Sequence, residues 1–499
     1  MKYFNFPKKI GIEHIFLAVA VILGSYLRFQ GVFTNSFAFT YDVGRDMLAL
    51  WDITHFVDLP FIGPTTGLPG LFYGPWWYWL LSPFSLIFGG DPRGIALIMG
   101  LLGIATVILF YYLGKKIGGE FIAVSLATLA SFSHVLISLS SQIWNPNIAP
   151  FFTILTLIVL SKIYTGKKPA PISFLFLGAL LTLSADIEVI YGILFSAGIV
   201  FSILFIKHFK FYPRDILLFF AGILIVLFPR MLFEVKNSFL MTKSLFLFFG
   251  SKDAGGPNII ELIPKRADIF LNHFSETISG GNKTIGTAII VVIIICLVFL
   301  YKKAGSTEKS LFKTSGIVIA TFFIGTIFFG HDIWPHYLVG LPVFYILVTA
   351  LTLSLIYRKL GAHVSVLLLA CLLFINFNPI SFVRSLNEPL WEGDASVYRN
   401  QLKVIDYIYK DADTRPFKYV VYTPPLHDYS YQYLFKWYGP LHFKQAPDQK
   451  ATLSYFILEP DLEQPARLLK WIGERKGDGR IMKEEKVAGG ITVQIRLAE

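Results

Sequence analysis

Long apolar stretches alternate with short polar ones along the first three quarters of this 499-residue chain. Eleven of the stretches approach the roughly 20 residues that an α-helix needs to cross a bilayer, and charged residues, Pro or Gly bound each of them. They lie near residues 12–28, 94–114, 120–139, 148–163, 171–185, 188–206, 215–233, 285–301, 314–330, 337–357 and 362–378. This pattern predicts an α-helical polytopic membrane protein with about eleven spans.

A further stretch, residues 74–90 (GPWWYWLLSPFSLIFGG), is apolar enough to cross but contains Pro75, Pro83 and a cluster of Trp. Such a composition is typical of a segment that lies in the membrane interface. If this segment does not cross, the Lys and Arg clusters between spans all fall on one side, which the positive-inside rule makes cytoplasmic. We therefore expect a multi-pass protein of the plasma membrane with a cytoplasmic N-terminus, an external C-terminus and a first external loop over residues 29–93.

The pattern changes near residue 379, from where charged residues are frequent and apolar runs are short. A helix near 396–411 precedes a strand FKYVVYTPP, a helix around 431–438, a strand SYFILEP, a helix near 464–475 and two terminal strands. This alternation predicts a small soluble α/β domain. The chain is thus expected to divide into a transmembrane domain, residues 1–378, and an extracytoplasmic domain, residues 379–499.

Composition supports a membrane protein and excludes several other classes. Apolar residues make up 54% of the chain and charged residues 15%, against roughly 25% charged in soluble domains, so an ordinary soluble or disordered protein is excluded. The net charge of +11 follows the predicted cytoplasmic loops, and no nucleic-acid partner is expected. Cys296 and Cys371 both lie in apolar runs, so neither a disulfide framework nor a cysteine metal site is predicted.

Several catalytic and nucleotide-binding motifs are absent from the sequence: there is no Walker loop, no GxGxxG after a strand, no HExxH and no GxSxG. The predicted spans also carry almost no central ionisable residues, which ion-coupled transporters and proton relays use. The unusual polar residues instead collect near the outer interface, in the external loops.

The external loop after the first span contains the motif TYDVGRDM, in which Asp42 and Asp46 are four residues apart. On a helix both carboxylates share one face, so one of them could act on a substrate while Arg45 orients it, with Tyr41 beside them. The same spacing is typical of a solvated interfacial helix with a salt bridge. The spacing leaves both interpretations open.

Two aromatic segments could line a groove for a lipid chain or a sugar. In GLFYGPWWYW, Tyr73 and the Trp cluster could serve this purpose or simply anchor to lipid headgroups. In the external turn SSQIWNPN, Trp144, Asn145 and Asn147 offer an aromatic face and neutral hydrogen-bonding groups, although Asn and Pro also form turns. These residues are candidates for donor or acceptor binding.

Basic and metal-ligating side chains gather in two later external loops. The candidates are His331, Asp332, His336 and Tyr337 in the loop GHDIWPHY, and Lys265 and Arg266 in the loop 234–284. The His and Asp side chains could bind a divalent metal, and the cations could pair with a lipid phosphate. An exposed charged loop without a ligand is the alternative.

The order of these features, an acidic motif, a Pro-aromatic interfacial segment and a long run of spans, resembles the membrane glycosyltransferases of the C superfamily. The resemblance is to the branch with protein O-mannosyltransferases and lipid A aminoarabinose transferases, and it covers roughly residues 10–360. TYDVGRDM is similar to the family's first-loop acidic motif, GLFYGPWWYWLLSPFSLIFGG to its Pro-aromatic segment, and HYLVGLP to its late His/Tyr-Pro element. The chain departs from the family at Val43, where a second acid is often seen, and at the neutral Gln142, Asn145 and Asn147.

The resemblance implies transfer of a sugar from a polyprenyl-phosphate donor to an acceptor protein, lipid or glycan outside the membrane. Phosphate departs as a stable anion, so the reaction needs a carboxylate base for the acceptor hydroxyl and cations for the phosphate, but no general acid. The implied roles are a base for Asp42, support for that base from Asp46 and Arg45, and phosphate contacts from His336 with Lys265 or Arg266. In-line displacement would invert the anomeric centre, and the need for a divalent metal is left open.

Three other classes of protein share part of this pattern. A transporter or flippase of lipid-linked sugars would also be polytopic and aromatic, and polar midplane residues and broken helices would identify it. A polysaccharide polymerase or ligase of another fold would use the same lipid phosphates. A scaffold without activity would leave the long acidic first loop unexplained.

Overall fold

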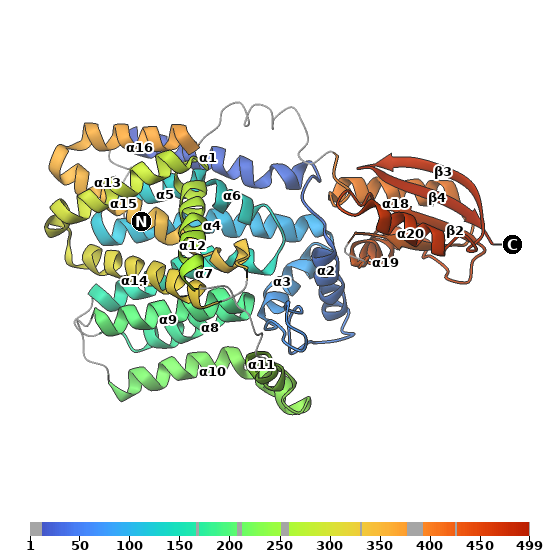
Figure 1. Cartoon of the computed structure of the whole chain (residues 1–499), viewed down its shortest axis with the longest axis horizontal. Coiled ribbons are helices and arrows are strands. Elements are labelled where there is room, and N and C mark those ends of the chain that lie inside the picture. Colours follow the sequence, from blue (N-terminus) through green and yellow to red (C-terminus); the bar gives the residue numbers. More distant parts are fainter. Residues whose placement is uncertain are drawn as a thin grey trace, which may run out of the picture.

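The computed structural model describes residues 12–165, 169–206, 212–250, 259–329, 332–376, 393–424 and 427–498. Figure 1 shows a bundle of helices that holds most of the chain and, at one end of it, a smaller part that contains a sheet. The fold class predicted from the sequence is confirmed.

The helices of the bundle lie where the apolar runs predicted them, with the third run divided in two. Their bounds are α1 (Ile12–Phe33), α4 (Pro92–Gly118), α5 (Glu120–Phe132), α6 (His134–Ser140), α7 (Ala149–Thr165), α8 (Ile172–Ile187), α9 (Val189–Phe205), α10 (Pro213–Lys236), α13 (Lys283–Leu300), α14 (Ser306–Phe328), α15 (Leu341–Leu360) and α16 (Ala362–Asn376). Within the described residues six helices are long and apolar enough to cross a membrane, and the bent pair α5 and α6 forms one more candidate. Four shorter apolar helices occupy the other predicted runs.

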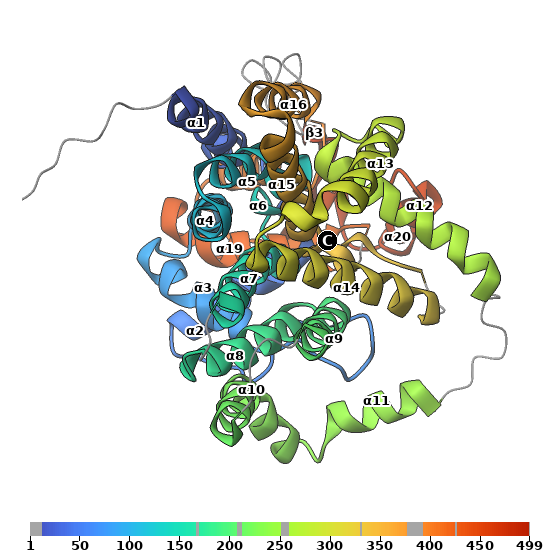
Figure 2. The same cartoon turned by 90° about the vertical axis from the view of Figure 1, so that its left-hand side faces the viewer.

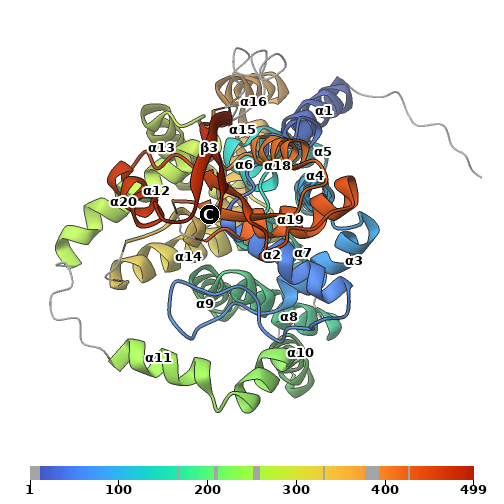
Figure 3. The same cartoon turned by 90° about the vertical axis from the view of Figure 1, so that its right-hand side faces the viewer.

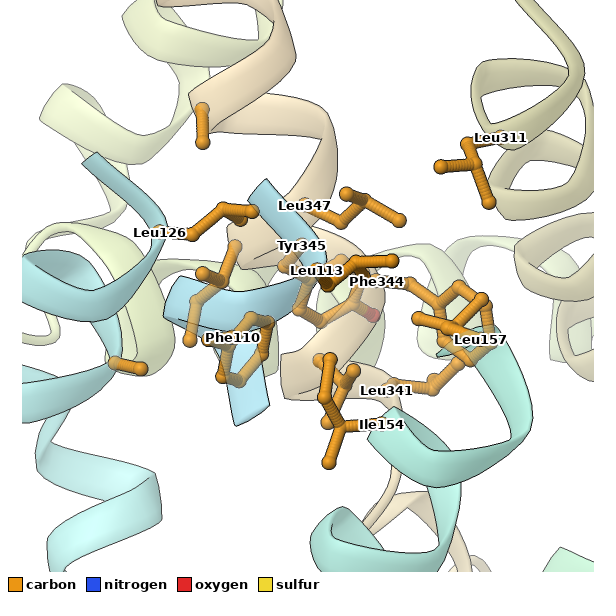
Figure 4. Close-up of a cluster of buried hydrophobic side chains, with 14 of the residues drawn as sticks. Phe110, Leu113, Leu126, Ile154, Leu157, Leu311, Leu341, Phe344, Tyr345 and Leu347 are labelled. Atoms are coloured by element: carbon orange, nitrogen blue, oxygen red, sulfur yellow. The ribbon is translucent and has the colours of Figure 1, made fainter. Parts of the chain in front are cut away.

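The centre of the bundle is apolar and closely packed. In α15, 83% of the most apolar 18-residue stretch is buried. In the span that α7 forms with η1 (Asn145–Ile148) the buried share is 72%, whereas in α10 and α13 it is 17%. Figure 2 shows α7 and α15 well inside the bundle, and Figure 4 shows Phe110, Leu157 and Phe344 as members of its buried apolar cluster. The apolar outer faces of α10 and α13 are therefore suited to contact with lipid chains.

The third predicted span bends by 62° between α5 and α6. Such a break frees backbone carbonyls, and an unsatisfied carbonyl in apolar surroundings costs several kcal/mol. Arg28 of α1 supplies donors for two carbonyls of α5: Nη1 donates to Ser131 and Nη2 to Ala130, each at 3.0 Å. Nη1 also donates to the Gly24 carbonyl within α1 at 2.8 Å. The buried arginine therefore fastens α1 to the broken span.

Both long connections of the bundle contain helices. In the first, α2 (Tyr41–Thr54) packs against α3 (Trp76–Ile87). With 12 residues α3 is about 18 Å long, too short for the roughly 30 Å hydrocarbon core, in agreement with the expectation that this segment does not cross. In the second, α11 (Leu240–Gly250) precedes α12 (Ile259–Ile278), which runs across the bundle (Figure 1).

The C-terminal part has the predicted elements in the predicted order. They are α18 (Tyr398–Ala412), β1 (Phe417–Tyr422), α19 (Tyr429–Phe443), β2 (Leu453–Leu458), α20 (Pro465–Glu474), β3 (Arg480–Ala488) and β4 (Ile491–Leu497). The sheet has the order β1-β2-β4-β3, with β1 and β2 parallel and the other pairs antiparallel. Because α18 and α19 cover one face and α20 the other, β2 is buried on both faces, which accounts for its continuous apolar run.

An apolar core joins the C-terminal part to the first long loop, residues 29–93. Tyr433 and Trp437 of α19 are buried in the same cluster as side chains of α2 and α3. The Tyr433 hydroxyl donates to the Gly90 carbonyl, and Nε1 of Trp437 donates to the Gly89 carbonyl at 2.9 Å. Figure 3, viewed from the C-terminal part, shows α19 beside α2. This contact holds the first loop between the spans and the sheet.

The closest approach of α2 to α19 is at Gly44, where an added Cβ would lie 2.2 Å from the backbone nitrogen of Ser430. We expect Gly44→Ala to lower stability by about 1–3 kcal/mol, since backbone must shift to admit the methyl group. Thermal unfolding of the purified protein measures this. Gly67→Ala, in the same loop with nothing within 4 Å of its Cβ, is the matched control, and equal melting temperatures for the two variants would contradict this packing.

Candidate active site

The acidic motif of the first loop forms the start of α2. Asp42 lies in the first turn, where the helix dipole favours a negative charge. Nη1 of Arg45 lies 2.7 Å from the Asp42 carboxylate, and Nη2 lies 2.9 Å from that of Asp46. One guanidinium therefore holds both acids on one side of the helix.

The two acids have different surroundings. Asp46 is 2% exposed and also accepts hydrogen bonds from Nε1 of Trp77 at 2.8 Å and from the Tyr78 hydroxyl at 3.1 Å. Burial raises the pKa of Asp46, and Arg45 and Trp77 oppose that rise. The side chain of Asp42 is 23% exposed. Asp46 thus holds α2 against α3, while the Asp42 carboxylate is accessible from outside.

A third acid, Glu188, lies between α8 and α9. It is 1% exposed, its Oε2 accepts from the Tyr73 hydroxyl at 2.8 Å, and its Oε1 accepts from the Ile190 N–H at 3.4 Å. Burial raises the pKa of Glu188 to about 7, against the effect of these two hydrogen bonds. The pKa of Tyr73 is raised by burial and by Glu188, and also by the charges of Tyr337 and Asp42. The charge of Asp42 is the smallest of these effects, and it acts on Tyr73 and not on Glu188.

The 3-10 helix η3 (Pro335–Leu338) places His336 beside Glu188. Nε2 of His336 lies 4.0 Å from Oε2 of Glu188, beyond a hydrogen bond. Its ring packs edge-on against Trp144, with centroids 5.0 Å apart, and against Tyr337 at 4.5 Å. Because burial lowers the pKa of His336 to about 4, the imidazole is neutral at pH 7 and offers a hydrogen bond, not a charge.

The two asparagines of the SSQIWNPN turn hold backbone in place. Nδ2 of the buried Asn145 donates to the Ile187 carbonyl at 2.5 Å, directly before the buried acid. Nδ2 of Asn147 donates to the Gln142 carbonyl at 3.2 Å. Trp144 is therefore the member of this turn whose ring reaches the site.

The predicted phosphate partners Lys265 and Arg266 lie on α12. Lys265 is exposed. Arg266 is buried, and it donates from Nε to the Thr326 carbonyl at 3.1 Å and from Nη2 to the Phe329 carbonyl at 3.2 Å. These carbonyls end α14, where the helix dipole favours a cation, so Arg266 also ties α12 to α14.

Two of the three predicted metal candidates, Asp332 and His336, lie within the described residues. Asp332 is exposed and its charge acts on Arg266, while His331 lies outside the described residues. In the part of the chain that the structure describes, no group of three or more His, Cys, Asp or Glu side chains could hold a metal ion. Of the two candidates that are described, His336 lies beside one acid of this site, Glu188.

Glu188 and the pair Asp186–Arg230 were not among the site residues expected from the sequence. Arg230 of α10 forms an ion pair with Asp186 in the last turn of α8. The Gly74 N–H donates to the Asp186 carbonyl at 3.0 Å, and a Cβ on Gly74 would overlap the Asp186 carboxylate, so only glycine permits this approach. The available signal in the sequence was that these charged residues interrupt apolar stretches near their ends.

The buried Glu188 should make stability depend on pH. Its pKa rises from 4.5 to about 7 on folding, so this carboxyl stabilises the fold below pH 4.5 and loses that effect as the pH rises through 7. Glu188→Gln retains an acceptor for Tyr73 without the charge. We expect it to be more stable than the wild type at pH 8, by up to about 3 kcal/mol, and similar near pH 4.5. Thermal unfolding across this range measures the difference.

Glu261→Gln, at an exposed acid of α12, is the control for the effect of removing one negative charge from the protein. It should follow the wild type at every pH. Parallel curves for wild type and Glu188→Gln would show that Glu188 is not the buried acid described here.

Comparisons with known proteins give structural similarity without sequence similarity. No protein-family model matches the chain, and no curated protein sequence matches it. The crystal structure of ArnT from Cupriavidus metallidurans bound to undecaprenyl phosphate is similar at a TM-score of 0.59 and 13% identity, covering 97% of this chain and 98% of that one. The apo form of the same ArnT gives a TM-score of 0.60 with the same identity and coverage.

This chain has the fold of ArnT. The similarity covers nearly the whole of both chains, so the fold that the sequence resemblance led us to expect is confirmed. The oligosaccharyltransferase AglB from Archaeoglobus fulgidus, in complex with an inhibitory peptide and a dolichol-phosphate, is similar at a TM-score of 0.44 and 12% identity, covering 89% of this chain and 69% of that one.

Proposed function

We propose that this protein is a membrane glycosyltransferase that transfers a sugar from a polyprenyl-phosphate donor to an acceptor at the external face. The ArnT fold supports the class of enzyme, and the undecaprenyl phosphate bound to ArnT supports the class of donor. The positive-inside pattern supports the external side for the C-terminal part and for the first loop.

The observation that carries the proposal is the position of Asp42. It is the accessible acid of the three, it starts a helix, and Arg45 fixes its carboxylate at 2.7 Å. Asp46 and Glu188 are both buried and occupied by hydrogen bonds. Among the acids of this site, Asp42 is therefore the one that an acceptor can reach.

In the proposed reaction, Asp42 takes the proton of the acceptor hydroxyl while that oxygen attacks the anomeric carbon of the sugar. The bond from the anomeric carbon to the phosphate oxygen breaks, and its electron pair leaves with the polyprenyl phosphate. Arg45 orients the base and Asp46 holds Arg45. Attack opposite to the leaving phosphate inverts the anomeric centre.

The donor would be bound by the residues around Glu188. Tyr73, Trp144 and Tyr337 present aromatic side chains, and neutral His336 can donate to a phosphate oxygen. We assign the positive charge for the phosphate to Lys265 or Arg266, as the sequence suggested. A divalent metal could add to that charge, so the assay below includes it as a variable.

The experiment is incubation of the purified full-length protein with a panel of polyprenyl-phosphate sugars, measuring release of free polyprenyl phosphate. Each donor is tested with and without divalent metal and with lipid, peptide and glycan acceptors. Release from one donor, dependent on an acceptor, supports the proposal and identifies the sugar. Absence of release from every donor contradicts it.

A flippase for lipid-linked sugars is the second candidate, because the bent pair α5 and α6 is a broken span with the buried Arg28 beside it. Reconstitution in liposomes with a labelled lipid-linked sugar tests this function. Flipping without sugar transfer would favour the transporter, whereas transfer without flipping would favour the enzyme.

A further inference from the structure

Three lysines surround a pocket at the end of the bundle away from the C-terminal part. The chain turns there from α13 through η2 (Tyr301–Lys303) into α14 (Figure 1). The pocket has a volume of about 250 Å³. It is lined by Tyr301, Lys302, Ser306, Lys309, Ser310 and Lys313.

The charges of this pocket are not neutralised by the protein. In the described part of the chain, no carboxylate forms an ion pair with Lys302, Lys309 or Lys313. The half-buried Lys309 donates from Nζ to the Lys302 carbonyl at 3.2 Å, and its Nζ lies 5.9 Å from the centre of the Tyr301 ring. The Tyr301 hydroxyl donates to the Lys309 carbonyl at 3.4 Å, so the cation is held in the pocket wall.

Glu308, the acid of this turn, interacts with Arg358 and with the backbone and not with the lysines. It is 2% exposed, and its carboxylate accepts from Nη1 and Nη2 of Arg358 at 2.7 and 2.5 Å and from the Gly305 N–H at 2.6 Å. It therefore does not cancel the three lysines. Ser306 and Ser310 add hydroxyl groups, and the first turn of α14 adds the positive end of a helix dipole.

The surface next to the pocket is apolar and exposed. Val298 and Phe299, at the end of α13, are 70% and 76% exposed, and α13 as a whole is a membrane-span candidate of which only 17% is buried. A ligand with a phosphate in the pocket could therefore lay acyl chains along α13. A free phosphate ion would use the cations but not this apolar face.

We propose that this pocket binds the phosphate of an anionic lipid headgroup from the leaflet at this end of the bundle. Unpaired lysines and hydroxyls are suited to phosphate oxygens, and the positive-inside pattern makes this leaflet the cytoplasmic one. The 23 residues of α14 span about 34 Å, so the pocket is separate from the site around Asp42 and does not depend on the proposed function.

The test is native mass spectrometry of the full-length protein in detergent, titrated with phosphatidylglycerol or phosphatidylcholine. We expect the wild type to bind phosphatidylglycerol more tightly, and Lys309→Gln to weaken that binding about fivefold, the contribution of one lysine at an anionic membrane surface. Lys303→Gln is the matched control, since Lys303 is exposed in the same turn but does not line the pocket. Lys313→Gln, at an exposed position of the wall, repeats the test if Lys309→Gln fails to fold.

The proposal is supported if Lys303→Gln still binds phosphatidylglycerol tightly while the pocket variants bind it more weakly. An equal loss in Lys303→Gln and in the pocket variants would overturn the proposal, because diffuse charge would then attract the lipid. Equal affinity of the wild type for both lipids would also overturn it. Inorganic phosphate separates the two sources of ligand: displacement of the lipid by an equal concentration of phosphate would identify a free anion as the ligand, and retention of the lipid would support the headgroup.

Discussion

Asp42→Asn is expected to lower the rate of sugar transfer by about 10²- to 10⁴-fold, the usual contribution of a general base. The amide has the same shape and can still accept a hydrogen bond from Arg45, but it cannot take the proton of an acceptor hydroxyl. Because Asp42 is partly exposed, the substitution should leave the melting temperature close to that of the wild type. Release of polyprenyl phosphate under saturating donor and acceptor measures the rate.

Asp58→Asn is the matched control, since Asp58 is an exposed acid of the same loop and the change in charge is identical. It should transfer sugar at nearly the wild-type rate. Near-normal turnover by Asp42→Asn would contradict the assignment of Asp42 as the base, but it would not contradict the fold or the proposed class of donor. An equal loss of transfer rate in both variants would show that the rate depends on the total charge of the loop and not on Asp42 itself.

Asp46→Ala is expected to cost about 3–5 kcal/mol of folding stability, although Asp46 is only one helical turn from Asp42. The substitution leaves the indole of Trp77, the hydroxyl of Tyr78 and part of the Arg45 guanidinium without their acceptor in a buried site. Thermal unfolding, or the share of monodisperse protein after gentle heating, measures the loss. Asp46→Asn, which retains an acceptor oxygen, should lose less.

Asp42→Ala provides the comparison on the same helix. It also removes a partner of Arg45, but this ion pair is partly exposed, and pairs in contact with solvent contribute only about 0–1 kcal/mol. A melting temperature for Asp46→Ala as high as that of Asp42→Ala would show that the hydrogen bonds of Asp46 do not stabilise the first loop. The two acids are therefore separable: loss of rate reports on Asp42, and loss of stability reports on Asp46.

The elements of the fold could be predicted because they depend on local properties of the chain. The apolar runs became helices, since a backbone in a bilayer must satisfy its own hydrogen bonds. Pro75, Pro83 and the Trp cluster predicted that residues 74–90 lie in the interface, and α3 is too short to cross. The order of elements after residue 379 followed from alternation and turn residues.

Part of the candidate site was also predictable. The motif TYDVGRDM marked Asp42, Arg45 and Asp46, whose spacing of three and four residues requires only a helix to bring them together. His336 and Trp144 were recognised by residue type and by their place outside a span. Spacing alone did not reveal that they pack against each other.

What only the tertiary structure decided is burial and long-range pairing. Asp42 and Asp46 are alike in sequence, but Trp77 and Tyr78 of α3 donate hydrogen bonds to Asp46, which is the buried one. Tyr73 and Glu188 are 115 positions apart, and no local pattern pairs them. Composition and spacing determined the class of protein, its elements and the first-loop motif, because these depend on near neighbours; the environment of each charge depends on which distant segments pack around it.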